Sequence, residues 1–212
     1  MQALVAQASA AGTTLMVCHT LRYSRPMNAA REAMRTEGWR PTNVVARGLS
    51  RRHENVGWTG RRRSWTDDLL WHHGGHVVDA VLTFLDAPVV EVTAAIGPVW
   101  DRSGLPMDYA IALRTADGAV ASISLSYNAR IGTSDYVIIG PDQTIVIDGA
   151  EVRDADGPIL TTESVAEAQE HAIWAQEADF LESIRTGRRP VADAAAILPA
   201  MRVLQAVWDR VV

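Results

Sequence analysis

The chain has 212 residues, 48% of them hydrophobic, and carries 20 basic against 25 acidic side chains. That length suits one well-packed α/β or α+β domain, and the composition excludes long disordered or collagen-like segments. All 20 basic residues are arginine, which excludes a catalytic, Schiff-base or P-loop lysine. The 15 glycines form neither G-x-G-x-x-G nor G-x-x-x-x-G-K, so no dinucleotide- or nucleotide-binding loop is recognisable.

The N-terminal quarter predicts two helices alternating with two strands, at residues 2–11, 13–18, 25–37 and 43–49. Gly12 is the expected stop of the first helix. The only cysteine, Cys18, excludes an intrachain disulfide and a Cys-rich zinc site. Because it falls in the apolar first strand, we expect a small buried side chain there rather than a nucleophile.

Arginine is concentrated early in the chain. Residues 1–65 carry 11 arginines against 3 acidic residues, and residues 66–212 carry 9 against 22. Six arginines lie between Arg47 and Arg63, around a polar segment that predicts an ordered functional loop. Guanidinium groups clamp carboxylates, which favours a small anionic ligand; the alternative is that these arginines pair with the acid-rich remainder. The negative net charge argues against a nucleic-acid partner.

The second half predicts a sheet and two closing helices. Apolar and polar residues alternate on both sides of Asp117-Gly118, which predicts a hairpin, and further strands are expected at 89–97, 134–140 and 143–148. A helix over 162–186 is expected to bury its apolar residues: Ile173, Trp174, Phe180, Leu181 and Ile184. The last helix is expected to bury Ile197, Met201, Leu204 and Trp208, with Pro199 kinking it or setting its first turn. The predicted fold class is α+β: an open, mainly antiparallel β-sheet with helices packed on one face.

Three of the six histidines fall on one predicted helix, which begins at a Thr66 or Asp67 cap. His72, His76 and Asp79 are spaced i, i+4 and i+7, so they share a helix face. One hypothesis makes His76 or His72 a general acid/base, with Asp79 orienting an imidazole. A weaker alternative is a zinc site on His72 and His76, with Asp79, His19 or His53 as third ligand. The plainest alternative is that these residues only pack the helix against the sheet.

Glycines 74 and 75 interrupt the same helix. Each lowers helix propensity by about 1 kcal/mol relative to alanine. That cost makes sense if another group approaches the backbone closely at this point.

Two segments resemble the Gfo/Idh/MocA family of nicotinamide-dependent oxidoreductases. Cys18-His19-Thr20-Leu21-Arg22-Tyr23 resembles the segment that links its two domains, and the run ending His76-Val77-Val78-Asp79 resembles its catalytic-histidine motif. The resemblance implies that His76 is the acid/base and that His72 and Arg22 lie near the substrate. With the arginines, tryptophans and histidines around them, the expected substrate contacts are Arg22, His19, Arg63, Trp65 and His73. Most family members carry an aspartate at the position of His72.

The resemblance also implies two domains. Residues 1–20 would be the remnant helix and strand of a lost Rossmann unit, and residues 21–212 the substrate and dimerisation domain. The family's cofactor-binding glycines and Glu-Lys-Pro motif would lie before Met1, so we expect no cofactor site in this chain. NAD or NADP would bind only if a Rossmann domain is supplied elsewhere.

Three functions follow as hypotheses. The first is a cofactor-independent acid–base enzyme (isomerase, lyase or lactone/hemiacetal hydrolase) acting on a carboxylated or hydroxylated, cyclic substrate. The second is a fragment or subunit of an NAD(P)-dependent dehydrogenase, and the third is a non-catalytic dimeric binding module. We expect a homodimer formed through the β-sheet. Neither a signal peptide nor a membrane span is recognisable, so a cytoplasmic location is expected.

Overall fold

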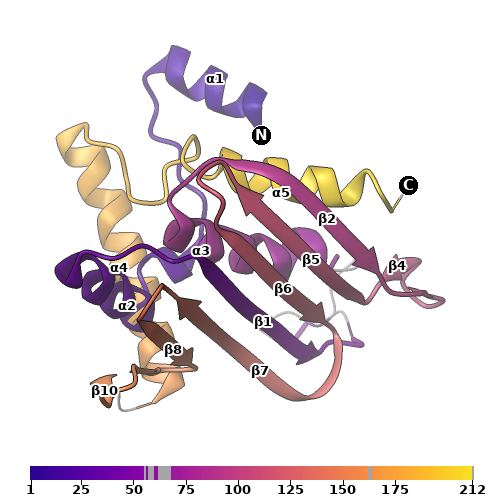
Figure 1. Ribbon diagram of the computed structural model, residues 1–212. Helices are drawn as coiled ribbons and strands as arrows, with labels where there is room; N and C mark the ends of the chain where they lie inside the picture. Colours follow the sequence, from indigo (N-terminus) through magenta and orange to yellow (C-terminus); the bar gives the residue numbers. More distant parts are fainter. Residues whose placement is uncertain (55, 57–59, 62–67, 162–163, 212) are drawn as a thin grey trace.

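The computed structural model describes residues 1–54, 56, 60–61, 68–161 and 164–211, and its centre is an eight-stranded sheet (Figure 1). The strand order is β10-β9-β8-β7-β1-β6-β5-β2. The strands are β1 Asn43–Arg51, β2 Val89–Ile96, β5 Asp108–Thr115, β6 Val120–Ser126, β7 Asn128–Ile139, β8 Thr144–Asp148, β9 Glu151–Arg153 and β10 Pro158–Leu160. A separate pair joins β3, Val99–Trp100, to β4, Leu105–Pro106.

All neighbouring strands of the large sheet are antiparallel except β1 and β6, which run parallel. The predicted hairpin is confirmed: β5 and β6 pair across the turn at Asp117-Gly118, and buried residues alternate with exposed ones along both strands. The early strand β1 inserts between β6 and β7, so the sheet is not a simple meander. The expected fold class, an open and mainly antiparallel sheet, is confirmed.

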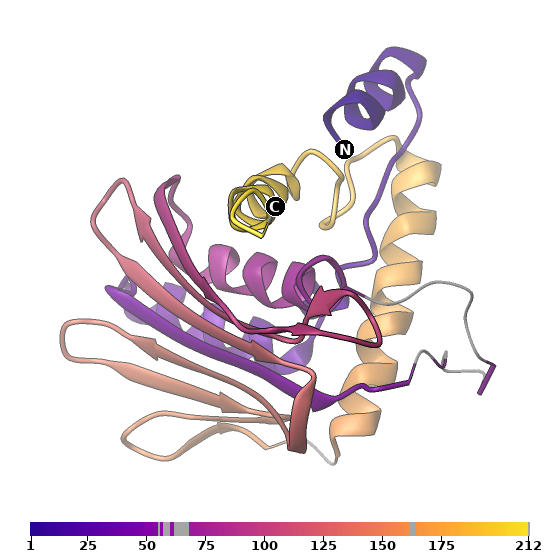
Figure 2. The same cartoon turned by 90° about the vertical axis from the view of Figure 1, so that its right-hand side faces the viewer.

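The helices lie on one side of this sheet (Figure 2). They are α1 Gln2–Ala11, α2 Arg25–Glu37, α3 Gly75–Leu85, α4 Val165–Thr186 and α5 Leu198–Trp208. Helix α3 covers β1 and β6, α5 packs on α3 and β2, and α2 packs on the strands β8 to β10. Pro199 lies in the first turn of α5, as one of the two sequence alternatives proposed. The opposite face of the sheet stays open and carries small side chains, among them Ala95, Ala110, Ala112, Ser122 and Ser124.

The hydrophobic core lies between the sheet and these helices. Its fully buried members come from both layers: Leu69, Leu70, Phe84, Leu85, Ile111, Ile123, Leu125, Tyr127, Tyr136, Ile138, Ile147 and Ile197. Within the described residues no helix has both the length and the apolar composition that crossing a membrane requires.

The prediction of a buried strand over residues 13–18 is wrong. The segment makes a single bridge, Met16 to Asp193, and pairs no regular strand. Cys18 is exposed, contrary to the expected burial. Among the described residues, the one bridge of this segment pairs Met16 with Asp193 and does not include Cys18. Residues 1–20, which the resemblance assigned to the remnant of a Rossmann unit, contain α1 and an extended segment.

The expected burial along α4 is also wrong. The helix has the predicted bounds to within three residues and ends at Gly187, in the left-handed region at φ 74°. However, Trp174, Leu181 and Ile184 are 69%, 66% and 56% exposed. The face that packs against α2 and the turn Thr20–Arg22 carries smaller or polar side chains instead: Ala172, Gln176 and Ser183.

Candidate active site

The clustered histidines lie where one π-helical turn, Leu70–Gly74, continues directly into α3, Gly75–Leu85. Asp68 stabilises the start of this turn, because its Oδ1 accepts hydrogen bonds from Leu70 N at 2.7 Å and Trp71 N at 3.1 Å. A π-helical turn inserted into an α-helix is rare and often marks a functional site. The local backbone therefore departs from the regular α-helix that the histidine spacing predicted.

Two glycines let this helix start lie close to the sheet. A Cβ atom at Gly74 would lie 3.0 Å from Leu125 Cδ1, and one at Gly48 on β1 would lie 2.9 Å from Val77 Cγ2. At Gly75 the nearest atom would be 3.8 Å away, which is ordinary contact. The close approach expected from the glycine pair thus exists at Gly74, and the approaching group is a side chain of the sheet.

Asp79 is the buried centre of the site, with 1% of its surface exposed. Arg22 Nε and Nη2 each donate to one of its oxygens at 2.8 Å, which forms a bidentate pair. His19 Nδ1 lies 3.0 Å from Asp79 Oδ2. Burial favours the neutral acid, but the hydrogen bonds from Arg22 and the close imidazole of His19 outweigh it and hold the pKa of Asp79 below its usual value. Asp79 is therefore an anion at neutral pH.

His76 is a half-buried imidazole beside this centre. Its ring centroid lies 5.2 Å from that of His19 and 6.4 Å from that of His72. Its Nδ1 is buried and has no hydrogen-bond partner among the residues that the structure describes. Burial is the main reason that the pKa of His76 falls to about 4; neighbouring histidines lower it further, and Asp79 opposes them. The ring is thus neutral at pH 7 and can accept a proton.

Tyr127, directly after β6, joins the other two histidines. Its hydroxyl lies 2.7 Å from His72 Nδ1, and its ring stacks on His73 with centroids 6.1 Å apart. The Arg52 guanidinium lies 6.0 Å from the Tyr127 ring centroid. Burial and then the charges of His72 and Arg52 lower the pKa of His73. The sequence motifs did not single out Tyr127. The available signal was the alternation of the hairpin, which places Tyr127 directly after β6 on its buried side.

The structure brings together most of the residues that the sequence singled out, but Asp79 and Arg22 contact other groups than the sequence predicted. Asp79 contacts the imidazole of His19 rather than one from its own helix. The three nitrogens of Arg22 all donate to protein acceptors, including the carbonyls of Val191 and Ala196 at 3.0 Å. Arg22 therefore fixes Asp79, and its position near a substrate, which the resemblance implies, stays a prediction.

Some sequence predictions cannot be followed in space. Arg63 and Trp65, the expected substrate contacts, and Thr66 and Asp67, the expected cap, lie outside the described residues. In the part of the chain that the structure describes, no group of three His, Cys, Asp or Glu side chains is arranged to hold a metal ion. The zinc alternative on His72 and His76 therefore gains no third ligand there.

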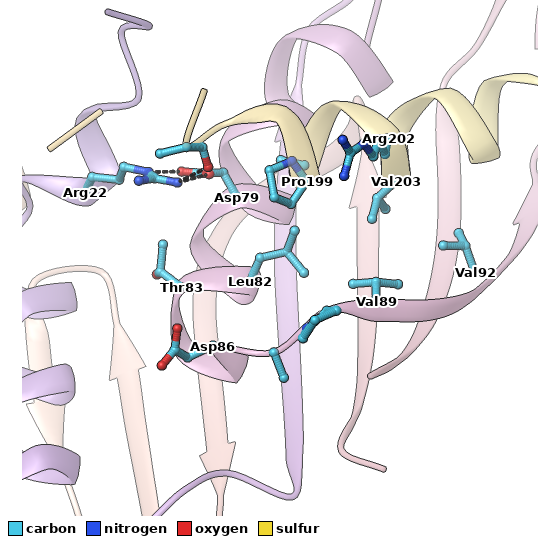
Figure 3. A pocket seen from close by; sticks show the side chains of 14 residues that line it. Arg22, Asp79, Leu82, Thr83, Asp86, Val89, Val92, Pro199, Arg202 and Val203 are labelled. Carbon is cyan, nitrogen blue, oxygen red and sulfur yellow. Dashed lines mark hydrogen bonds and ion pairs between the residues drawn. The ribbon is translucent and has the colours of Figure 1, made fainter. Parts of the chain in front are cut away.

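A groove of about 650 Å³ borders the Asp79–Arg22 pair between α3, α5 and β2 (Figure 3). Its walls are mainly apolar, with Arg202 and Asp86 among the charged groups that line it. Its lining includes no histidine. The groove thus reaches the buried pair, and His76 is not among the residues that line it.

Two comparisons with known sequences concern the family. Residues 32–163 match the family described as bacterial oxidoreductases, C-terminal. Over 155 residues, 72% of this chain, the sequence is 33% identical to 4-carboxy-2-hydroxymuconate-6-semialdehyde dehydrogenase from Sphingobium sp. strain NBRC 103272 / SYK-6. The match spans 48% of that enzyme's length. The chain therefore covers about half of this relative.

Solved structures share the fold at lower sequence identity. An oxidoreductase from Agrobacterium radiobacter, in complex with NAD+, L-tartaric acid and magnesium, is 19% identical with a TM-score of 0.80, over 98% of this chain and 66% of that chain. The WlbA dehydrogenase of Bordetella pertussis, in complex with NADH and UDP-GlcNAcA, is 19% identical with a TM-score of 0.78, over 97% and 64%.

A putative myo-inositol dehydrogenase from Sinorhizobium meliloti gives 18% identity and a TM-score of 0.75, over 97% of this chain and 65% of that chain. Each of these matches covers almost all of this chain but less than two thirds of the solved chain. The chain therefore belongs to the bacterial oxidoreductases of the Gfo/Idh/MocA type, and it corresponds to their C-terminal domain.

Proposed function

We propose that this chain supplies the substrate-binding and proton-transfer half of a nicotinamide-dependent dehydrogenase site. The observation that carries the proposal is the state of His76: a neutral, half-buried imidazole whose Nδ1 has no partner in the described structure. It lies beside a carboxylate that two protein groups hold ionised. A general acid/base needs such a ring, because it must take up and release a proton at the reacting oxygen.

The chain's own residues do not fit the nicotinamide dinucleotide. The sequence contains no G-x-G-x-x-G, the glycine loop that holds the dinucleotide phosphates. A dinucleotide-binding domain on the same protein or on a partner would have to hold the cofactor. A nicotinamide bound there would supply the hydride acceptor for the reaction.

The surface around α1 and α4 fits the packing of such a domain. Helix α1 buries none of its residues, and α4 exposes a large apolar face that includes Trp174 and Leu181. Exposed apolar patches of this kind mark interaction sites in proteins. The solved relatives are longer than this chain by about the size of a further domain.

The proton step belongs to this chain. The substrate carbon carries a hydroxyl, as in an alcohol, an aldehyde hydrate or a hemiacetal. Neutral His76 accepts the hydroxyl proton while the carbon loses a hydride, so that a C–OH group becomes C=O and the histidine becomes a cation. The anion Asp79, close to His19 and His76, stabilises positive charge in this cluster.

We propose a small carboxylated compound as substrate. The Sphingobium relative is named for a carboxylated semialdehyde, and Arg52 brings a guanidinium to the Tyr127 ring beside His73. Guanidinium groups recognise carboxylates in a planar, bidentate way. The family match favours this dehydrogenase over the cofactor-independent isomerase, lyase or hydrolase expected first from the sequence.

We further propose that the protein is a homodimer through the open face of the sheet. The small side chains at Ala95, Ala110, Ala112, Ser122 and Ser124 let a second sheet approach closely. Sheets that pack face to face lie about 10 Å apart, a spacing that small residues favour.

A chimera tests the proposed function. The segment of the Sphingobium enzyme that aligns with this chain is replaced by this chain, and reduction of NAD or NADP is followed by absorbance with that enzyme's semialdehyde. We expect turnover, and a loss of about 100-fold or more in kcat with His76→Gln. Equal turnover by the His76→Gln chimera would refute the proposal, as would a folded chimera that binds both ligands without turnover.

A further inference from the structure

His19 occupies an unusual position for a polar side chain. It is 5% exposed and precedes the short turn Thr20–Arg22, a part of the chain far in sequence from α3. Its Nδ1 lies 3.0 Å from Asp79 Oδ2, and its ring lies 5.2 Å from the ring of His76, with the two planes inclined by 42°. The His19 ring thus lies next to both the buried carboxylate and the candidate acid/base.

The two neighbours of His19, Asp79 and His76, differ in how many hydrogen bonds fix their side chains. Asp79 is fixed by two hydrogen bonds from Arg22, so the carboxylate beside His19 has a defined orientation. A carboxylate at Nδ1 favours the tautomer with the proton on that nitrogen. His76 makes no hydrogen bond at its own Nδ1 in the described structure, and His19 Nδ1 is close to Asp79 Oδ2 but likewise makes no aligned hydrogen bond there. The rings nearest to His76 are those of His19, with centroids 5.2 Å apart, and His72, with centroids 6.4 Å apart.

We propose that His19 is a positioning residue, which passes the fixed orientation of the Asp79–Arg22 pair on to the ring of His76. The proposal rests on the proposed function, in which His76 moves the proton. It replaces the substrate contact that sequence reasoning expected of His19, since a side chain this deeply buried offers a substrate almost no surface.

The pKa and the tautomer ratio of the His76 ring report directly on its contact with His19. The titratable groups that act on it are His19, His72, His73 and Asp79, and burial is the largest influence. Among these groups, His19 is the nearest ring by centroid distance and the one in contact with Asp79. Removing the His19 ring opens the site to water and takes away an imidazole whose charged form would lower the pKa of His76, and each change raises that pKa.

Two substitutions separate the two contacts of His19. His19→Asn keeps a donor near the position of Nδ1 but removes the ring that faces His76. His19→Phe keeps a ring of similar size but removes the donor to Asp79. His171→Asn on α4, an exposed histidine outside the site, is the matched control.

The measurement is a pH titration of the isolated chain with 15N-labelled histidine, followed by NMR. With His19→Asn we expect the pKa of His76 to rise by about 1 or more. With His19→Phe we expect the pKa to stay low and the tautomer ratio of His76 to change, because the replacing ring is not held by Asp79. The control should leave both quantities as in the unaltered chain.

Several results would overturn the proposal. If both variants fold and the pKa and tautomer ratio of His76 stay unchanged, His19 is only a buried side chain. If His19→Asn does not fold, an unchanged tautomer ratio in His19→Phe alone refutes positioning. In the chimera, we expect both variants to lower kcat about tenfold with KM within twofold; a raised KM with unchanged kcat would make His19 a substrate contact. The NMR result needs no turnover, so it stands apart from a failure of the proposed function.

Discussion

Acidification should destabilise this protein through His76. Its pKa is about 4 in the folded chain and 6.5 when unperturbed, so between these values the unfolded chain binds the proton and the folded chain does not. The stability that the neutral ring permits is complete above pH 6.5 and is lost as the pH falls toward 4. At 1.36 kcal/mol for each pKa unit, lowering the pH from 7.5 to 5 costs about 2 kcal/mol at this one residue.

The assay is urea unfolding at pH 7.5 and at pH 5, in the unaltered chain and in His76→Gln. Glutamine does not titrate, so we expect the variant to lose about 2 kcal/mol less than the unaltered chain over this pH interval. The low pKa of His73 adds pH dependence of the same sign to both proteins and cancels in the comparison. An equal loss in both proteins would show that His76 is not held neutral by burial.

Three further predictions concern packing, charge and assembly. Gly48→Ala places its Cβ 2.9 Å from Val77 Cγ2 and should lower the free energy of unfolding by about 1–3 kcal/mol, measured by chemical unfolding. Gly75→Ala should leave that free energy unchanged or raise it by up to about 1 kcal/mol, so an equal loss in both variants would contradict the packing described. Arg22→Ala leaves buried Asp79 without its main partner and should cost about 3–5 kcal/mol by the same assay, and a cost below 1 would mean that the pair does not hold the carboxylate. Ala112→Arg puts a charge on the open sheet face and should convert a dimer to a monomer by light scattering; an unchanged dimer would place the interface elsewhere.

Elements defined by local periodicity could be predicted from the sequence. The two-residue alternation around Asp117-Gly118 specified both strands of the β5–β6 hairpin and the face that each buries. The glycines after α1, α2 and α4 marked helix ends, since each adopts the left-handed conformation there. These signals depend on neighbouring residues only, so a single sequence contains them.

Features that depend on distant partners could not be predicted. The apolar residues of α4 form a pattern typical of a buried helix face. Such a pattern indicates that a face is apolar but not which element covers it. Trp174 and Leu181 are exposed because nothing in the described structure packs on them. The extended segment around Cys18 failed as a strand for the same reason, since burial of a strand depends on strands beside it.

The candidate site shows the same division. The sequence placed His72, His76 and Asp79 on one helix, and all three belong to the cluster. It could not show that Arg22, 57 residues away along the chain, pairs with Asp79, nor that Tyr127 meets His72. A helix face can be read from spacing, but the groups opposite it are set by how the whole chain packs.

The fate of one hydrogen atom tests the central claim most directly. The chimera is given the semialdehyde of the Sphingobium relative with deuterium at its aldehyde carbon, and the reduced nicotinamide is analysed by mass spectrometry. The account predicts that the deuterium is found in the reduced nicotinamide, at a rate about 100-fold or more lower with His76→Gln. Deuterium that is released to water or kept in an isomerised product would contradict it, and so would transfer at an equal rate in both proteins.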